Sequence, residues 1–140
     1  MYDFSFEHIV SCVEQSLSRL NIDYIDVFLL HRPDILCDFE ELKSALTYSK
    51  ENNLVKQFGV CNMNKAYIEL FNKKTGFNFV INQLEFSITS TQLIDDILNM
   101  NTNDDLANDK SGEALIYCHL NNISLQAWSF LKISLSEGIL

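Results

Sequence analysis

Residues 24–34 have the sequence Tyr24-Ile25-Asp26-Val27-Phe28-Leu29-Leu30-His31-Arg32-Pro33-Asp34. Apart from one aspartate, the first part consists of β-branched, aromatic and leucine side chains, which is typical of a buried strand. A polar segment with the only proline of the chain follows at once, and proline cannot continue a sheet ladder. We therefore predict a buried strand that ends in a loop at His31.

The segments around this strand alternate between helical and strand patterns. Apolar residues at helical spacing predict helices at residues 5–20, 38–52, 65–75, 92–98 and 113–120. Asp38 and Glu41 have the spacing of a capping box at the start of the second helix. Short apolar runs predict the other strands at residues 56–62, 79–86 and 123–128. This alternation predicts an α/β domain of parallel strands joined by right-handed crossovers.

The composition argues against several classes of protein. With 140 residues, 47% of them hydrophobic, and one proline, the chain has the content of one packed globular domain and not of a disordered segment. Its net charge of −9 repels phosphate backbones and anionic lipids, so we expect neither nucleic acid nor a membrane as a partner. Scattered cysteines, no leader-like start and no long apolar run predict a cytoplasmic protein with reduced thiols.

Several common site motifs are absent from the sequence. No G-x-G-x-x-G, P-loop or G-x-S-x-G motif occurs, which argues against Rossmann dehydrogenases, P-loop NTPases and α/β-hydrolases. The acidic run at residues 103–105 does not have the carboxylate spacing of a calcium loop. Cys118 and His119 are adjacent and face different ways on a helix. We predict no metal site.

Polar and aromatic residues follow the predicted strands at their carboxyl ends, where parallel α/β proteins collect their ligands. These residues are His31, Asn62, Gln83, Glu85, Trp128 and Ser129. If the strands are neighbours, these side chains meet and suit a planar ring that carries an amide. Each also has a structural interpretation: the histidine as a hydrogen-bonded loop residue, the asparagine as a turn or cap residue, and the tryptophan as a core residue.

Several segments together resemble the aldo-keto reductase family in order and spacing from residue 5 to about residue 130. They are Ser16-Leu17-Ser18-Arg19-Leu20, residues 23–34, Phe58-Gly59-Val60-Cys61-Asn62, Asn82-Gln83-Leu84-Glu85-Phe86 and Ala127-Trp128-Ser129. The resemblance implies a (β/α)8 TIM barrel and an oxidoreductase that reduces aldehydes or ketones, which are small carbonyl substrates. In the family, NADPH binds in an extended form without a Rossmann fingerprint, which agrees with the missing glycine motif.

The resemblance also implies roles for individual residues. Hydride passes from the nicotinamide to the carbonyl carbon, while a tyrosine, assisted by a lysine and an aspartate, protonates the oxygen. His31 matches the catalytic histidine that orients the carbonyl, where a neutral imidazole N–H stabilises charge on oxygen. Asn62 and Gln83 match the cofactor-binding residues that hold the nicotinamide carboxamide.

Three further residues match the cofactor site of the family. Trp128 matches the aromatic residue that stacks on the nicotinamide, and Ser129 and Leu131 match the loop near the pyrophosphate. Two positions depart from the family pattern. Cys61 stands where the family usually has serine. The cysteine thiol makes a weaker hydrogen bond to the carboxamide than the serine hydroxyl does. Phe130 stands where many relatives have proline.

The resemblance covers only part of a barrel. It begins at the helix before the fourth barrel strand, so we expect residues 1–140 to form one aldo-keto-reductase-like domain, incomplete at both ends, with about four parallel strands. The catalytic aspartate, tyrosine and lysine belong to strands that are not matched, so the chain alone is expected to be inactive. The alternatives are a homodimer or a complementing half-barrel that closes the fold, or a non-catalytic remnant that serves as an interaction module.

Overall fold

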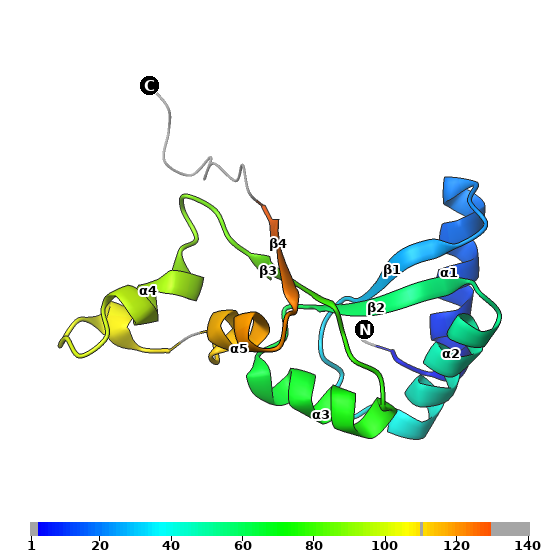
Figure 1. Ribbon diagram of the computed structural model, residues 1–140, viewed down its shortest axis with the longest axis horizontal. Helices are drawn as coiled ribbons and strands as arrows, with labels where there is room; N and C mark the ends of the chain where they lie inside the picture. Colours follow the sequence, from blue (N-terminus) through cyan, green and yellow to red (C-terminus); the bar gives the residue numbers. More distant parts are fainter. Residues whose placement is uncertain (1–2, 110, 130–140) are drawn as a thin grey trace.

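The computed structural model describes residues 3–109 and 111–129 (Figure 1). The helices are α1 (Phe6–Leu20), α2 (Phe39–Glu51), α3 (Lys65–Thr75), α4 (Gln92–Leu98) and α5 (Ala114–Leu120), with a 3-10 turn η1 (Asp105–Ala107). The strands are β1 (Ile25–Leu30), β2 (Val55–Cys61), β3 (Ile81–Glu85) and β4 (Ser124–Trp128). The predicted helices and strands are thus confirmed, with ends shifted by one or two residues at most.

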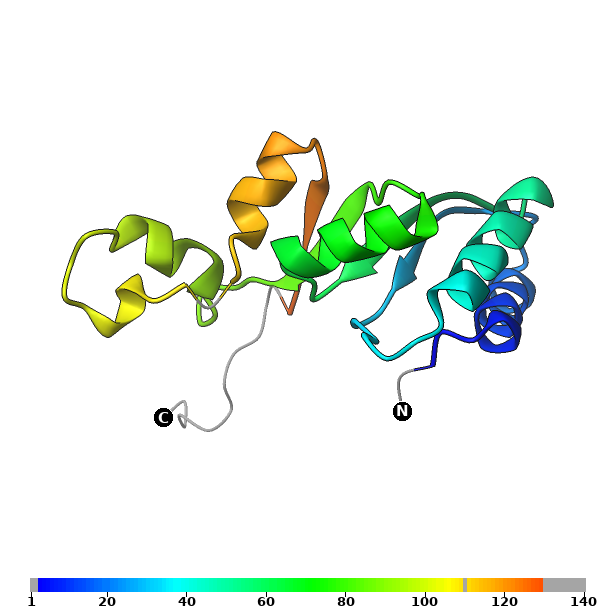
Figure 2. The same ribbon diagram turned by 90° about the horizontal axis from the view of Figure 1, so that it is seen from below.

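The strands form one sheet in the order β1-β2-β3-β4, and every neighbouring pair is parallel. The predicted parallel α/β architecture is therefore confirmed. Helices α1 and α2 lie beside the β1 end of the sheet and α5 lies next to β4, whereas α4 and η1 form a lobe that projects away from the sheet (Figure 1, Figure 2). Within the described residues, no helix has the length and apolar character needed to cross a membrane.

Side-chain caps and a glycine define where the helices begin and end. The Ser5 hydroxyl accepts from the His8 N–H at 3.4 Å at the start of α1. The Asn64 side-chain oxygen accepts from the Tyr67 N–H at 3.0 Å at the start of α3. Gly76 ends α3 at a φ of 77°, a left-handed conformation that glycine adopts without steric cost.

The predicted capping box at α2 is wrong in both of its contacts, although its first residue caps the helix in another way. Asp38 does cap the helix, because its carboxylate accepts from the Glu40 N–H at 2.8 Å. The Glu41 carboxylate instead accepts from the Phe6 N–H of α1 at 3.3 Å. The first N–H groups of a helix have no partner within it, so Glu41 satisfies one of these groups and ties α1 to α2.

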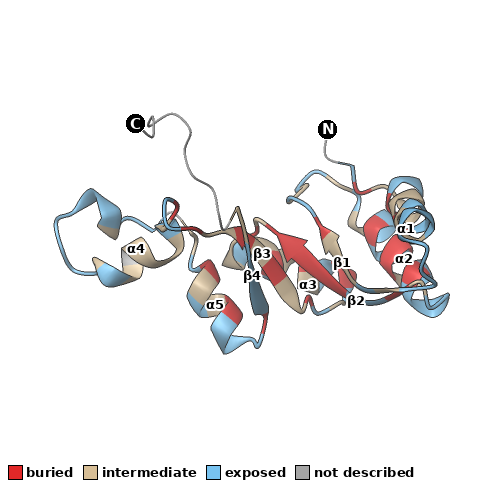
Figure 3. Ribbon diagram, turned by 90° about the horizontal axis from the view of Figure 1, so that it is seen from above, coloured by how far each residue is buried: buried red, intermediate tan, exposed pale blue. Residues whose placement is uncertain are grey.

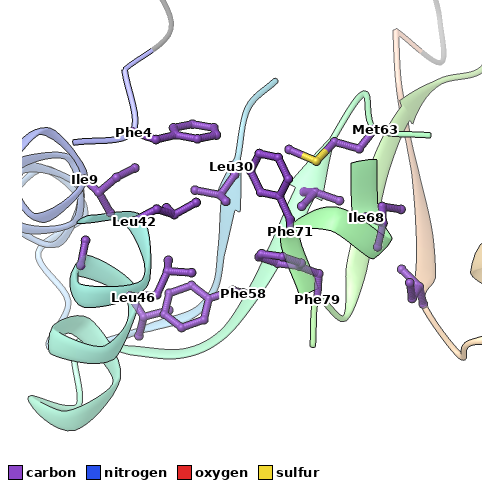
Figure 4. Close-up of a cluster of buried hydrophobic side chains, with 14 of the residues drawn as sticks. Phe4, Ile9, Leu30, Leu42, Leu46, Phe58, Met63, Ile68, Phe71 and Phe79 are labelled. Carbon is purple, nitrogen blue, oxygen red and sulfur yellow. The ribbon is translucent and has the colours of Figure 1, made fainter. Parts of the chain in front are cut away.

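The core fills the space between the helices and one face of the sheet (Figure 3, Figure 4). Phe71 of α3 lies at its centre, with edge-to-face contacts to Phe4 at 6.0 Å and Phe39 at 5.1 Å between ring centroids. Each such pair stabilises a fold by about 0.5–1.5 kcal/mol beyond its buried area. The other large side chains of the cluster are Ile9, Leu30, Leu42, Leu46, Phe58, Met63, Ile68 and Phe79.

The opposite face of the sheet is only partly covered. Leu29 pairs with Gly59 across β1 and β2, and Leu29 and Ile81 on this face are half-buried. Gly59 is needed for the close approach of the strands: a Cβ there would lie 2.5 Å from Leu29 Cδ2 and 3.0 Å from the Ile81 carbonyl oxygen. Strand β4 is almost entirely exposed (Figure 3).

Gly59→Ala is expected to lower the free energy of unfolding by about 1–3 kcal/mol, because the added methyl group overpacks the sheet. Urea unfolding followed by circular dichroism measures the change. Truncating the facing side chain in Leu29→Ala makes room for the methyl group, so the double variant should be more stable than the sum of the two single effects. An unchanged unfolding midpoint for Gly59→Ala would contradict this reading of the sheet.

Candidate functional site

The parallel sheet brings the carboxyl ends of β2, β3 and β4 side by side. Cys61 pairs with Gln83, and Gln83 pairs in turn with Gln126. One step further along, Glu85 pairs with Trp128. Because residues in register on parallel strands point to the same face, these side chains form two adjacent rows at one edge of the sheet.

A cavity of about 360 Å³ adjoins this edge. The loop after β1 contributes Arg32, the loop after β2 contributes Asn62, and β3 and β4 contribute Glu85 and Trp128. Side chains from outside the strand ends complete the wall, namely Tyr67, Gln92 and Ser111 among others. The cavity therefore offers one cationic, one anionic and several amide or hydroxyl groups beside an indole.

The loop from β2 to α3 is held in place from its neighbour β3. Asn62 has a φ of 56°, a left-handed conformation in which asparagine is enriched, and its backbone N–H donates to the Gln83 carbonyl at 2.9 Å. The fully buried Asn82 donates through Nδ2 to the Met63 carbonyl at 2.7 Å. Asn82 thus anchors the loop directly after the residue that faces the cavity.

A line of hydrogen bonds connects side chains from β2, β3 and β4. The Trp128 indole donates to Asn62 Oδ1 at 3.1 Å, and Asn62 Nδ2 donates to the Cys61 sulfur at 3.0 Å. The Cys61 thiol donates to Gln83 Oε1 at 3.7 Å, and Gln83 Nε2 donates to Gln126 Oε1 at 3.2 Å. Asn62, Gln83 and Trp128, which the sequence placed at one site, are therefore joined in one network.

The other predicted residues lie differently. His31 follows β1 and is exposed, and it does not line the cavity, whereas its neighbour Arg32 does. In the part of the chain that the structure describes, no side chain is hydrogen-bonded to the His31 imidazole. Ser129 follows Trp128 at a φ of 58° and is half-buried. Leu131 and Phe130 lie outside the described residues.

Sequence reasoning missed two kinds of site residue. Gln126 lies two positions before Trp128 on the same strand, so the twofold periodicity of strands places both side chains on one face and was the signal available. Tyr67 and Ser111 reach the cavity from a helix and from a distant loop. No local pattern predicts such contacts, because they depend on how α3 and the residues before α5 pack.

Burial changes the acidity of the Cys61 thiol. Loss of hydration raises its pKa, and the nearby Arg32 guanidinium opposes this only in part. The thiol therefore keeps its proton at neutral pH, and its S–H can donate to Gln83. Within residues 3–109 and 111–129, no group of three histidine, cysteine or acidic side chains is arranged to hold a metal ion.

The pKa of the Cys37 thiol, in the loop after His31, is raised by nearby negative charge as well as by burial. Burial, together with the carboxylates of Asp34 and Asp38, raises its pKa to about 11. We expect its alkylation by iodoacetamide at mildly alkaline pH to be roughly 100-fold slower than that of a free cysteine, because only the thiolate reacts. Site-resolved mass spectrometry measures the rate.

Asp34→Asn is the matched variant, because the amide oxygen can still accept from the Leu36 N–H while the charge is lost. It should speed the alkylation of Cys37. The raised pKa also affects the free energy of unfolding, because the folded state holds the Cys37 proton more tightly than the unfolded state does. The stabilisation from this proton is complete below about pH 9 and is lost as the pH rises toward about 11. Equal alkylation rates in the two proteins would show that the carboxylate does not act on the thiol.

Comparisons with known proteins place this architecture. The sequence model of the Aldo/keto reductase family matches residues 1–138. The chain is 34% identical over 128 residues to 6-dehydroglucose reductase of Agrobacterium fabrum, covering 91% of this chain and 38% of that protein. It also resembles the oxidoreductase YdhF of Escherichia coli, at 37% identity over 81 residues, 58% of this chain and 27% of that protein.

Solved structures agree with the sequence relatives. An aldo/keto reductase from Brucella melitensis superposes with a TM-score of 0.63 at 25% identity, over 92% of this chain and 43% of that one. A Bombyx mori aldo-keto reductase in complex with NADP gives 0.63 at 23% identity, over 91% of this chain and 38% of that one, which shows the shared fold. The matched part of the chain spans between 27% and 43% of the length of these four proteins.

The four parallel strands and their helices are therefore a section of a (β/α)8 TIM barrel, as predicted. The predicted family is confirmed by the match over residues 1–138 together with the curated relatives. Carboxyl strand ends are where barrels of this class collect their functional groups, and the side-chain network lies at that edge of the sheet. The chain belongs to the aldo/keto reductase family.

Proposed function

We propose that this chain supplies the nicotinamide-binding strand ends of an oxidoreductase that reduces small aldehydes or ketones with NADPH. One observation carries the proposal: two carboxamides and an indole, from Asn62, Gln83 and Trp128, are joined in one network at the carboxyl ends of adjacent parallel strands. Amides and an aromatic face at this end of a barrel suit a planar ring that itself carries an amide.

The donor set fits the nicotinamide group. A carboxamide needs both hydrogen-bond donors and acceptors, and the side chains of Asn62 and Gln83 each offer both. Trp128 is half-buried and lines the cavity, so part of its ring is available for stacking. When bound, the cofactor supplies the hydride for the carbonyl carbon; the residues named here hold and orient the ring.

His31 serves the substrate in this proposal. An imidazole N–H at the end of β1 hydrogen-bonds the carbonyl oxygen and stabilises the negative charge that develops there. Its exposure leaves it accessible to a small ligand. The relative from Agrobacterium fabrum is named for the reduction of 6-dehydroglucose, and we assign this chain the wider class of small carbonyl compounds.

Binding of parts of the cofactor tests the proposal. We expect NADP+ and nicotinamide mononucleotide to give saturation-transfer NMR signals with the 140-residue chain, and 2′,5′-ADP to give none, because the site described holds the nicotinamide end. The variant Asn62→Ala should weaken both positive signals. Binding of 2′,5′-ADP alone, or of none of the three ligands, would contradict a nicotinamide site.

The open edges of the sheet favour a second function, that of a half-barrel which pairs with another copy of itself. Within the described residues, β1 and β4 each have a strand on one side only. A twofold axis along the strands would place β4 beside β1 of the second copy, with parallel direction, and would cover the half-buried Leu29 and Ile81. Closure removes the free edges, which otherwise template aggregation.

Light scattering after size-exclusion chromatography tests this pairing. We expect a single species with twice the mass of the chain. A monomer, or a polydisperse aggregate, would contradict a self-closing barrel and would indicate that a different section of a barrel is needed.

A further inference from the structure

We propose that the indole N–H of Trp128 and the side-chain carbonyl of Gln126 are positioning groups that fix which way the amides of Asn62 and Gln83 face. This rests on the proposed function in so far as the two amides are the ones that hold the nicotinamide. Trp128 then has a polar role besides stacking, and Gln126 has a role of its own at the site.

The donor-to-acceptor direction of the hydrogen bonds in this network is set at Trp128. An indole nitrogen is a donor only, so the group 3.1 Å away must be the Asn62 oxygen. The Asn62 NH2 then faces the Cys61 sulfur at 3.0 Å. Turning the Asn62 amide over would set an NH2 against the indole N–H, which leaves two donors facing one another. The tryptophan therefore selects one of the two amide orientations.

The Cys61 thiol continues the same donor-to-acceptor direction toward Gln83. Since the sulfur accepts from Asn62, its own hydrogen is left to donate to Gln83 Oε1 at 3.7 Å. The buried thiol remains protonated at neutral pH because its pKa is raised. Gln83 Nε2 then faces the Gln126 side-chain oxygen at 3.2 Å.

Gln126 closes the network from the exposed strand β4, in register with Gln83. If the Gln83 amide turned over, the bond from Cys61 would be lost, and its oxygen would face the Gln126 oxygen unless the exposed Gln126 amide turned over with it. The bonds between nitrogen and oxygen have the moderate strength of a neutral pair and the two bonds of the thiol are weaker, but together they favour one orientation. The amides are thus set before any ligand arrives, so a bound carboxamide does not have to turn them.

NMR of the free 140-residue chain, labelled with ¹⁵N, tests the assignment without cofactor. The chain has one tryptophan, so a single indole N–H signal reports its bond to Asn62. We expect slow solvent exchange for this proton and for the Gln83 side-chain NH2. Gln126→Leu should shift the Gln83 NH2 signals and speed their exchange, whereas Gln126→Glu, which keeps an acceptor oxygen, should retain slow exchange.

Two further variants make the test specific. Trp128→Phe keeps an aromatic ring without the N–H, and it should shift the Asn62 NH2 signals and, through Cys61, those of Gln83. Gln57→Leu makes the same change as Gln126→Leu at another exposed strand position and should leave the Gln83 signals in place. The inference would be overturned if Gln126→Leu left the shifts and exchange rates of the Gln83 NH2 signals unchanged. It would also be overturned if the indole proton exchanged with solvent as fast as in an unfolded chain.

The affinity for NADP+ is a second, independent measurement of the positioning role. With NADP+, Gln126→Leu should weaken binding about 2–10-fold, the range expected for one neutral hydrogen bond, and Gln126→Glu should restore most of it. Equal affinities for wild type and Gln126→Leu would overturn the positioning role. If wild type itself does not bind NADP+, the proposed function fails, and the NMR signals of the free chain still decide whether the two groups orient the amides.

Discussion

The 140-residue chain by itself is expected to reduce a small aldehyde such as methylglyoxal at least about 100-fold more slowly than a complete reductase of its family. The reason is proton delivery, because general acid catalysis contributes roughly 10²–10⁴-fold to such a step. The family resemblance assigns this proton to a tyrosine, assisted by a lysine and an aspartate, on strands that the chain does not match.

The measurement is NADPH oxidation followed by absorbance, with 6-dehydroglucose reductase of Agrobacterium fabrum assayed alongside. Tyr67 lines the cavity, so Tyr67→Phe is the control for a substitute proton donor. Turnover of wild type near that of the complete reductase would contradict this expectation, because it would show that these 140 residues hold a working catalytic set.

The second large effect is expected for Asn82→Asp. Asn82 is fully buried and donates to the Met63 carbonyl at 2.7 Å. The variant replaces this donor with a carboxylate oxygen and buries an uncompensated charge, so we expect a loss of about 3–5 kcal/mol in the free energy of unfolding at neutral pH. Urea unfolding measures it, and Asn78→Asp at an exposed position is the matched control.

The pH dependence of this variant has a defined sign. Burial raises the pKa of the new carboxyl group in the folded state, so the penalty is largest at neutral pH and shrinks as the group is protonated toward about pH 5. Asn82→Leu should cost less, about 1–3 kcal/mol, because it also removes Asn82 Oδ1, which has no hydrogen-bond partner among the described residues. A penalty for Asn82→Asp that does not change with pH would contradict a buried charge.

The consequences of Asn82 reach the candidate site. Met63, whose carbonyl accepts from Asn82, directly follows Asn62. Loss of this hydrogen bond therefore loosens the loop that holds Asn62, whose side-chain oxygen accepts from Trp128. We expect Asn82→Leu to change the fluorescence of Trp128 in the folded state as well as the stability. This links a buried strand residue to the edge of the sheet where the candidate site lies.

The fold could be predicted from the sequence because its signals are local. The apolar run before His31, the helical spacing from Ser5 onward and Gly76 after α3 each depend on neighbours in the chain. The same locality explains the error at Glu41. Its carboxylate had two candidate partners, the N–H of its own helix start and that of Phe6, and only packing of α1 against α2 decides between them.

The sequence predicted which residues of the candidate site lie at strand ends, but not which side chains they are hydrogen-bonded to. Asn62, Gln83 and Trp128 follow from the rule that functional groups gather at carboxyl ends of parallel strands. Of these three residues, Asn62 and Trp128 line the cavity, and Gln83 joins them through the hydrogen-bond network. The twofold periodicity of the strand could have added Gln126, but its partner Gln83 became visible only with the register of β3 and β4, and the role of Asn82 only with the path of the β2–α3 loop. His31 shows the opposite case, since the strand rule places it at the same edge while the structure leaves it outside both the cavity and the network.

Nicotinamide binding at these strand ends is tested by a titration of the chain with NADP+ while the fluorescence of Trp128, its only tryptophan, is recorded. If the strand ends hold the nicotinamide against the indole, the emission falls and saturates, and Gln83→Leu weakens the apparent affinity while preserving the folded spectrum. A free tryptophan amide corrects for absorption of light by the cofactor. A decrease that never saturates and matches the free amide would show that these strand ends do not bind the nicotinamide.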